Sequence, residues 1–145
     1  MKANHIIVSD GLHVGGPTEM TSTKTLWIGR ITSALAAIFF VMDGVMKLFK
    51  LDVVVKTTVE LGYLESSIMP IGIVLLISTV VYMIPQTAIL GAVLLTGYLG
   101  GAVATHVRVG ADLFSIFFPV VFGVLVWLGL YLRNERLRAL IPIRS

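Results

Sequence analysis

The stretch "LLTGYLGGAVATHVRVG", residues 94–110, decides the fold of this chain. It begins as an apolar helix of the kind that enters a membrane, and it ends in Thr105, His106 and Arg108. Small residues recur four positions apart within it, a spacing that lets two membrane helices approach each other closely. The stretch therefore raises two questions: what the small residues pack against, and what the polar end meets.

The composition of the whole chain is that of an integral membrane protein. Its 145 residues are 57% hydrophobic and 13% charged, and the mean hydropathy is +0.96. Soluble domains carry about 25% charged residues. The net charge of +3 does not indicate a nucleic-acid partner, because most Lys and Arg flank apolar segments, where membrane topology explains them. The chain has no cysteine, which excludes disulfides, thiolate metal sites and cysteine nucleophiles.

Four apolar segments are each close to the roughly 20 residues that a helix needs to cross a bilayer. They cover residues 25–48, 68–84, 87–107 and 114–132. We therefore predict an all-α integral membrane four-helix bundle. Residues 1–23 are predicted to form an extramembrane N-terminal tail, and residues 24–145 the membrane domain.

The connections between these segments are short or helical. Pro85 predicts a tight turn after the second span, and Pro70 suits the first turn of that span. Between the first and second spans, Asp52 is a candidate N-cap and Gly62 a candidate helix stop. This connection is therefore predicted to hold a short interfacial helix.

The distribution of Lys and Arg predicts that both termini are cytoplasmic. The side with the termini and the turn at Pro85 carries Lys2, Lys24, Arg30, Arg133, Arg136, Arg138 and Arg144. The opposite side carries Lys47, Lys50, Lys56 and Arg108. Aromatic residues at both ends of the spans fit interfacial belts, with Tyr82 assigned to the cytoplasmic belt and Tyr63 to the outer one.

Small residues form two adjacent stripes on the third span. The candidate packing residues are Gly97, Gly100, Gly101 and Ala104, with Gly123 at the same spacing on the fourth span. We predict that the third and fourth spans pack face to face through them, or that one of these faces mediates oligomerisation. A glycine-lined ligand cleft is the alternative.

Ionisable residues gather at the non-cytoplasmic ends of two parallel spans. Asp43 and Lys47 are four apart on the first span and can pair along one helical face, while His106 and Arg108 end the third. One interpretation is a polar pocket, made of Asp43, Lys47, Tyr98, Thr105, His106 and Arg108, in which a histidine beside a carboxylate suits quinone chemistry or proton transfer. The other is a helix-end ion pair with Arg108 as an interfacial anchor.

No motif assigns a catalytic residue or a metal site. His5 and His13 lie in the tail, and His106 has no second histidine or cysteine near it. Walker loops, nucleophile elbows and zinc-binding HExxH helices are missing from the sequence.

Two long segments closely resemble the DoxX-like family of small bacterial membrane proteins. They are "IPQTAILGAVLLTGYLGGAVATHVRVG" and "LFSIFFPVVFGVLVWLGLYLRNERLRALIPIR", and the likeness extends upstream through "DGVMKLF" and "VELGY", over roughly residues 25–144. The resemblance implies a four-helix membrane bundle whose recurrent motif positions include Asp43, Lys47, Tyr98 and His106. Related proteins include a subunit of a thiosulfate–quinone oxidoreductase and components of membrane redox complexes.

The function expected from this resemblance is that of an accessory subunit of a membrane redox or quinone-linked complex in the bacterial cytoplasmic membrane. Quinone or lipid is the expected ligand, and the expected partners are membrane lipid and other membrane subunits or further copies of the chain. Two alternatives stay open. One is a non-catalytic assembly subunit that packs through its small-residue faces, and the other is a small lipid-binding, solute-binding or transport protein.

Overall fold

The computed structural model describes residues 22–141, and within that range the chain is helical without strands. The elements are α1 (Thr23–Leu48), α2 (Asp52–Glu60), the 3-10 turn η1 (Glu65–Ser67), α3 (Ile68–Met83), α4 (Ala88–Arg108), α5 (Leu113–Arg133) and α6 (Glu135–Leu140). Four helices are long and apolar enough to cross a membrane: α1, η1 with α3, α4 and α5. The predicted all-α four-helix membrane bundle is confirmed. The predicted tail lies almost entirely outside the described residues, so its boundary stays a prediction.

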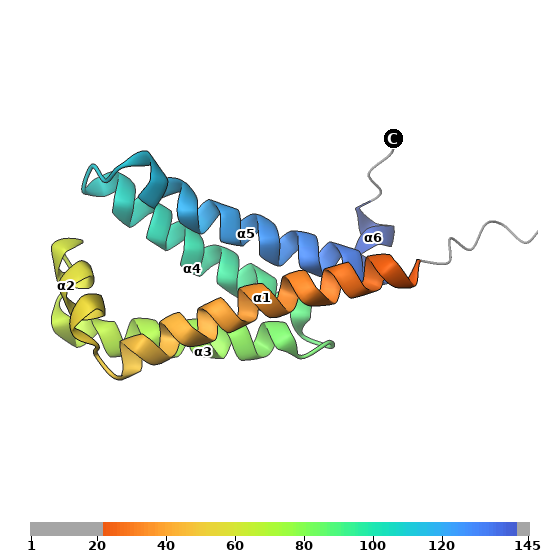
Figure 1. Ribbon diagram of the computed structural model, residues 1–145, viewed down its shortest axis with the longest axis horizontal. Helices are drawn as coiled ribbons and strands as arrows, with labels where there is room; N and C mark the ends of the chain where they lie inside the picture. Colours follow the sequence, from red (N-terminus) through yellow and green to blue (C-terminus); the bar gives the residue numbers. More distant parts are fainter. Residues whose placement is uncertain (1–21, 142–145) are drawn as a thin grey trace, which may run out of the picture.

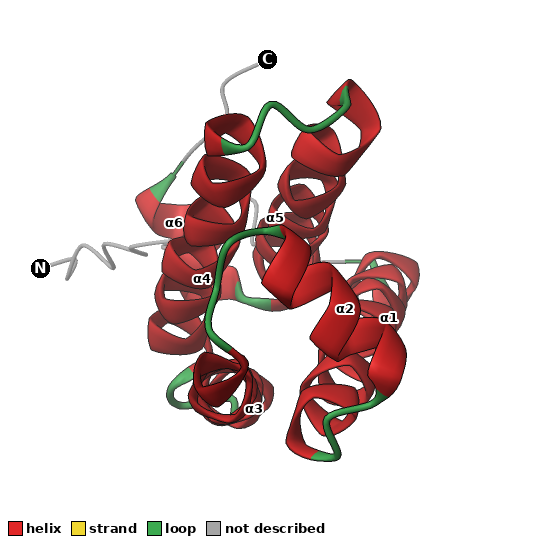
Figure 2. Cartoon of the chain, turned by 90° about the vertical axis from the view of Figure 1, so that its left-hand side faces the viewer, coloured by secondary structure: helices red, strands yellow, loops and turns green. Residues whose placement is uncertain are grey.

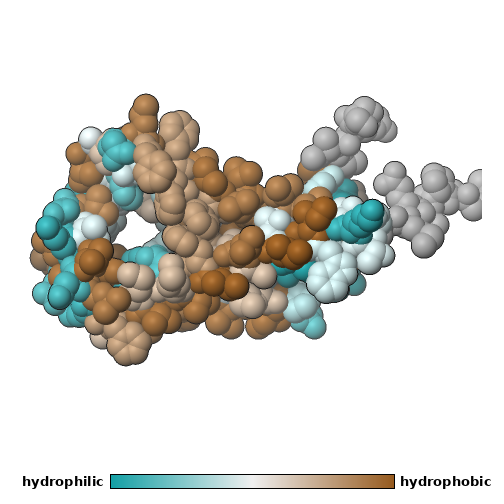
Figure 3. All heavy atoms as spheres, viewed as in Figure 1, coloured by the Kyte–Doolittle hydropathy of each residue, from teal (hydrophilic) through white to brown (hydrophobic). Residues whose placement is uncertain are grey.

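The four spanning helices form a ring in which each packs against two neighbours. Helix α1 contacts α3 and α5, and α4 contacts the same two helices. The pair α4–α5 diverges from the pair α1–α3 toward one end, and α2 lies across that end (Figures 1 and 2). Apolar side chains cover the middle of the molecule and polar ones gather at its ends (Figure 3), as a bilayer requires.

Glycines in the left-handed conformation end two helices at the α2 end. Gly62, with φ +83°, follows α2, and Gly110, with φ +67°, follows α4. In both turns the residue after the glycine donates its backbone N–H to a carbonyl of the helix. Tyr63 donates to the Thr58 carbonyl, and Ala111 donates to the His106 carbonyl. The predicted helix stop at Gly62 and the interfacial helix are therefore present. Asp52 is not the N-cap, however: Leu51 holds that position, and Asp52 lies in the first turn.

Close backbone contact holds α1 against both of its neighbours. A Cβ atom on Gly29 would lie 3.1 Å from the carbonyl oxygen of Gly129, and one on Gly129 would lie 3.2 Å from that of Gly29. Gly44 on α1 and Gly72 on α3 meet in the same way, since a Cβ on Gly72 would lie 3.1 Å from the Gly44 carbonyl. Both crossings bring backbones closer than any side chain allows.

The end opposite α2 is closed around Tyr82, which is fully buried. Its hydroxyl donates to the Val126 carbonyl on α5 and lies 2.9 Å from Ser33 Oγ on α1. Arg133 donates to the Tyr82 carbonyl at 3.0 Å and lies over its ring, while Gly91 on α4 packs directly on its backbone. The assignment of Tyr82 to the interfacial belt was wrong, because this tyrosine links all four helices instead.

The small residues singled out on the third span do not make the helix contacts predicted for them within the chain. A Cβ atom on Gly97, Gly100 or Gly101 would meet nothing within 4 Å, and Ala104 is exposed. Gly123 has only the Leu99 side chain near it, at 3.8 Å from such a Cβ. Helices α4 and α5 are neighbours, but larger side chains separate them. Oligomerisation through these faces stays a prediction.

This contrast between glycines gives a direct test. Gly91→Ala places a methyl group against the Tyr82 backbone, and we expect it to lower the stability of the bundle by about 1–3 kcal/mol. Gly97→Ala is the matched control on the same helix, where the methyl group enters open space, and we expect no loss of stability. Thermal unfolding of the detergent-solubilised variants, followed by circular dichroism, measures the difference. Equal melting temperatures would contradict the Gly91–Tyr82 contact.

Candidate functional site

The divergence of the helices leaves a cavity of about 610 Å³ at the α2 end. All four spanning helices line it, and α2 with the following loop covers it. Figure 3 shows the molecule hollowed here, between α4–α5 on one side and α1 with α2 on the other. Ligand sites in proteins have volumes of about 300–1,000 Å³, so the cavity is large enough for a small molecule.

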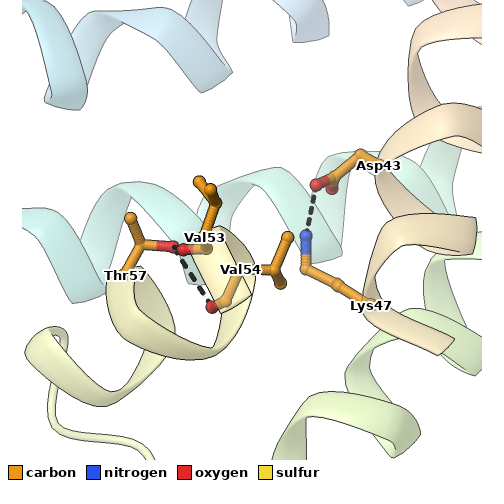
Figure 4. Close-up of polar contacts among 5 residues, drawn as sticks. All are labelled: Asp43, Lys47, Val53, Val54 and Thr57. Carbon is orange, nitrogen blue, oxygen red and sulfur yellow. Dashed lines mark hydrogen bonds and ion pairs between the residues drawn. The ribbon is translucent and has the colours of Figure 1, made fainter. Parts of the chain in front are cut away.

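An ion pair on α1 forms one polar wall of the cavity. Lys47 Nζ lies 2.5 Å from Asp43 Oδ1, and the side chains are 14% and 31% exposed. The predicted pairing along one helical face is present. Figure 4 shows the pair facing α2, where Lys47 lies beside Val54 and the Thr57 hydroxyl bonds to backbone carbonyls of its own helix. Because the two charges neutralise each other, the wall carries no net charge.

Helix α4 supplies the opposite polar wall. Tyr98, Thr105 and His106 line the cavity together with Gly97 and Gly101. Because these two glycines have no side chains, the cavity is wider beside them. Their position agrees with the alternative prediction of a glycine-lined ligand cleft.

Two hydrogen bonds within this wall fix its polar groups. His106 Nδ1 lies 2.8 Å from the Ala102 carbonyl, one turn earlier on α4. The Thr105 hydroxyl donates to the Gly101 carbonyl at 2.9 Å. Both side chains are therefore held against their own helix.

The loop after α2 is fastened to α4 by two side chains. Arg108 Nη2 donates to the Leu61 carbonyl at 2.7 Å, and the Tyr63 hydroxyl lies 2.8 Å from Thr105 Oγ1. The Thr105 proton is used on Gly101, so Tyr63 is the donor in the second bond. Arg108 does not line the cavity and is not part of a shared pocket with Asp43, which corrects the sequence-based prediction. Its long side chain reaches sideways to the loop.

Tyr63 was assigned from the sequence to an interfacial belt, and its place on the cavity was missed. Its position after the left-handed Gly62 turns the ring back over the cavity, toward α4. The sequence predicted the helix stop at Gly62, but it did not predict the direction of the side chain that follows.

A chain of phenylalanine rings forms the apolar wall between α1 and α5. Phe39 stacks on Phe122 with ring centroids 4.0 Å apart, and Phe118 packs on Phe122 at 5.1 Å. Phe114 extends the chain to the surface, and Phe40 continues it into the core. The cavity thus combines flat apolar ring faces with hydrogen-bonding groups on α1 and α4.

Asp112, at the mouth of α5, is a helix cap. Its carboxylate accepts hydrogen bonds from the Ser115 hydroxyl at 2.7 Å and the Ser115 N–H at 3.1 Å. These bonds, the side-chain one foremost, hold the pKa of the exposed carboxyl below its ordinary value of 3.8. Asp112 therefore orders the start of α5 and is not among the cavity-lining residues.

A second hollow, an apolar groove of about 600 Å³, runs along the outside of α4 and α5. Gly100 and Gly123 lie on its floor, and Trp127 Nε1 donates to Thr96 Oγ1 at 2.8 Å beside it. We refer to this hollow as the α4–α5 groove. Gly100, Gly123 and the cavity glycines thus lie on two different surfaces.

Within residues 22–141 no group of three or more His, Asp or Glu side chains is placed to hold a metal ion. His5 and His13 lie outside the described residues. The roles expected of Asp43, Lys47, Tyr98, Thr105 and His106 in chemistry stay predictions, although the structure brings these five residues around one cavity.

The comparison with protein-family models matches residues 31–129 to the DoxX-like family. This range covers α1 from its third turn, α2, α3, α4 and most of α5, and so includes every side chain described on the cavity. No curated protein and no solved structure matches the chain.

The fastening of the loop can be tested by hydrogen exchange. Tyr63→Phe removes one hydrogen bond to α4, and we expect amide exchange in α2 to rise roughly two- to tenfold, as the loss of about 0.5–1.5 kcal/mol requires. Arg108→Ala should act in the same direction. Lys56→Ala, on the exposed side of α2, serves as the control and should leave exchange unchanged. If Tyr63→Phe exchanges like the control, the loop is held by something else.

The Asp112 cap predicts a pH dependence. A carboxyl whose pKa is lowered on folding stabilises the folded state above its unfolded pKa, and this contribution is lost as the pH falls through the folded value. We expect the first turn of α5 to lose exchange protection on acidification below pH 3.8. Asp112→Asn keeps an acceptor for Ser115 but does not titrate, so its protection should not show this loss. An identical acid response in both proteins would contradict the cap.

Proposed function

Because this chain belongs to the DoxX-like family and encloses a cavity with a polar end, we propose that it is an accessory subunit of a membrane redox or quinone-linked complex. It is a small integral membrane protein with four membrane-spanning helices. The observation that carries the proposal is the cavity, in which Asp43, Tyr98 and His106 meet within the span region. Ionisable groups within membrane spans are unfavourable unless they are paired or face a cavity, and they commonly mark ligand or proton pathways.

The chemistry of the cavity favours a lipid-soluble ligand. The helices that line it diverge toward the α2 end (Figure 1), and we expect a molecule dissolved in the bilayer to enter between them. Phe39, Phe118 and Phe122 offer apolar ring faces, while the opposite side offers hydrogen bonds. Electrons would come from a partner subunit or from the ligand itself.

The α4–α5 groove favours an accessory role over an isolated one. Its lining exposes no polar surface, and Gly100 leaves room on its floor for a neighbouring helix to approach. A subunit of this kind needs both a ligand cavity and a face for its partner, and the two hollows lie on different sides of α4.

We place the protein in the bacterial cytoplasmic membrane with both termini in the cytoplasm. Among the described residues, Lys24, Arg30, Arg133, Arg136 and Arg138 lie at the end with the termini. Lys47, Lys50, Lys56 and Arg108 lie at the α2 end, together with most of the acidic residues. The terminal end thus carries more Lys and Arg than the α2 end, five against four among the described residues, which favours it as the cytoplasmic side. The cavity then faces the outer leaflet.

The accessory role is tested by gentle extraction of the tagged protein from native membranes, followed by native mass spectrometry. We expect the chain to leave the membrane in an assembly with redox subunits. Gly100→Leu extends a side chain into the α4–α5 groove from a position where a Cβ atom meets nothing within 4 Å, and we expect it to weaken that assembly roughly tenfold, or about 1.4 kcal/mol. His106→Ala should keep the assembly and lower its redox activity.

The outcomes separate the alternatives. A chain that emerges alone, or only with copies of itself, overturns the accessory role. An intact assembly whose activity is unchanged by His106→Ala favours the non-catalytic assembly subunit. The melting temperature of each variant, measured in detergent, shows that a loss of assembly is not a loss of fold.

A further inference from the structure

The hydrogen bond of His106 determines which of its ring nitrogens carries a proton. Nδ1 lies 2.8 Å from the Ala102 carbonyl oxygen, and a carbonyl can only accept. Nδ1 is therefore protonated. In the neutral imidazole, Nε2 is then an acceptor, and no described side chain donates to it. The cavity wall thus presents a fixed lone pair at His106.

The other polar groups of the cavity divide into those already used and those still available. Thr57 and Thr105 give their protons to backbone carbonyls, and Tyr63 gives its proton to Thr105. Asp43 uses one oxygen for Lys47, and its second oxygen has no donor among the described residues. The available acceptors are therefore His106 Nε2 and Asp43 Oδ2.

Three groups that can donate remain in the cavity lining. The Tyr98 and Thr58 hydroxyls have no hydrogen-bond partner among residues 22–141, and Lys47 has protons beyond the one directed at Asp43. An anionic headgroup fits this set poorly, because the Lys47 charge is already neutralised and Asp43 would repel it. The ligand that fits is uncharged and both donates and accepts hydrogen bonds.

A ring hydroxyl meets these requirements and a ring carbonyl does not. A hydroxyl donates to His106 Nε2 or Asp43 Oδ2 and accepts from Tyr98. A carbonyl accepts from Tyr98 but donates to neither acceptor, so it forms fewer hydrogen bonds with this set of groups than a hydroxyl does. The stacked rings of Phe39 and Phe122 provide the flat apolar surface that an aromatic ring packs against.

We propose that the cavity binds an uncharged lipophilic phenol or hydroquinone, with its ring against the phenylalanine wall and its hydroxyl donated to His106 Nε2. This inference rests on the proposed function, since it specifies the ligand of the same cavity. It is a statement about binding and holds whether or not the chain assembles with a redox partner.

The test is a binding measurement on the purified full-length chain in lipid nanodiscs, under anaerobic conditions. The probes are decylhydroquinone, its dimethyl ether and the oxidised decylquinone, which share one ring and tail and differ in their hydroxyl protons. We expect the hydroquinone to bind at least tenfold more tightly than the other two. Equal affinity for all three would show an apolar hollow without this recognition and would overturn the proposal.

Two variants locate the recognition. His106→Ala should abolish the preference for hydroquinone while leaving the affinity for the dimethyl ether unchanged. Trp127→Phe is the control, because Trp127 lines the α4–α5 groove and not the cavity. This variant should keep the preference for hydroquinone. A preference that survives His106→Ala would overturn the role of Nε2.

The wild-type comparison of the three probes needs no variant, so it stands even if a substitution disturbs folding. It also separates the two proposals. A chain that prefers hydroquinone but enters no assembly keeps this inference and loses the accessory role. A chain that assembles but binds all three probes equally keeps the accessory role and loses this inference.

Discussion

The packing of four helices around Tyr82 is the constraint on which the rest of the structure depends. In lipid, apolar side chains gain little by meeting one another, so helices associate where backbones approach and polar groups pair. Tyr82 provides both, because Gly91 packs on its backbone and its hydroxyl joins α1 to α5. With one end held in this way, the helices are free to diverge at the other.

The cavity follows from that divergence. Gly44 and Gly72 keep α1 and α3 together along their length, and no such crossing joins α1 to α5 near Phe39 and Phe118. Phenylalanine rings fill part of the gap, and α2 spans its end. Because the loop after α2 reaches α4 through hydrogen bonds of Tyr63 and Arg108, we expect this cover to open more easily than the packed helix pairs.

Much of this architecture was predictable from the sequence, because hydropathy and helical periodicity are local properties. They gave the four spans, the interfacial helix and the shared faces of Asp43 with Lys47 and of Tyr98 with His106. The small-residue pattern was less informative, since spacing identifies a face but not what covers it. Gly97 and Gly101 face the cavity, whereas Gly29 and Ser33, which have the same four-residue spacing on α1, meet Gly129 at a close crossing that was not predicted. Arg108 escaped prediction because its long side chain reaches beyond its own helix.

The neutrality of the cavity explains how charged residues persist there. Each charge within a membrane span is unfavourable by roughly 2.5–3.5 kcal/mol at the helix centre, and less near the ends. The charges of Lys47 and Asp43 offset each other, because the two side chains are one helical turn apart. Neutral His106 donates a hydrogen bond from Nδ1 to the Ala102 carbonyl of its own helix. What remains is a set of hydrogen-bonding positions without a net field. We propose that such a site selects its ligand by the positions of its hydroxyl protons rather than by charge, the property in which the reduced and oxidised forms of one ring differ.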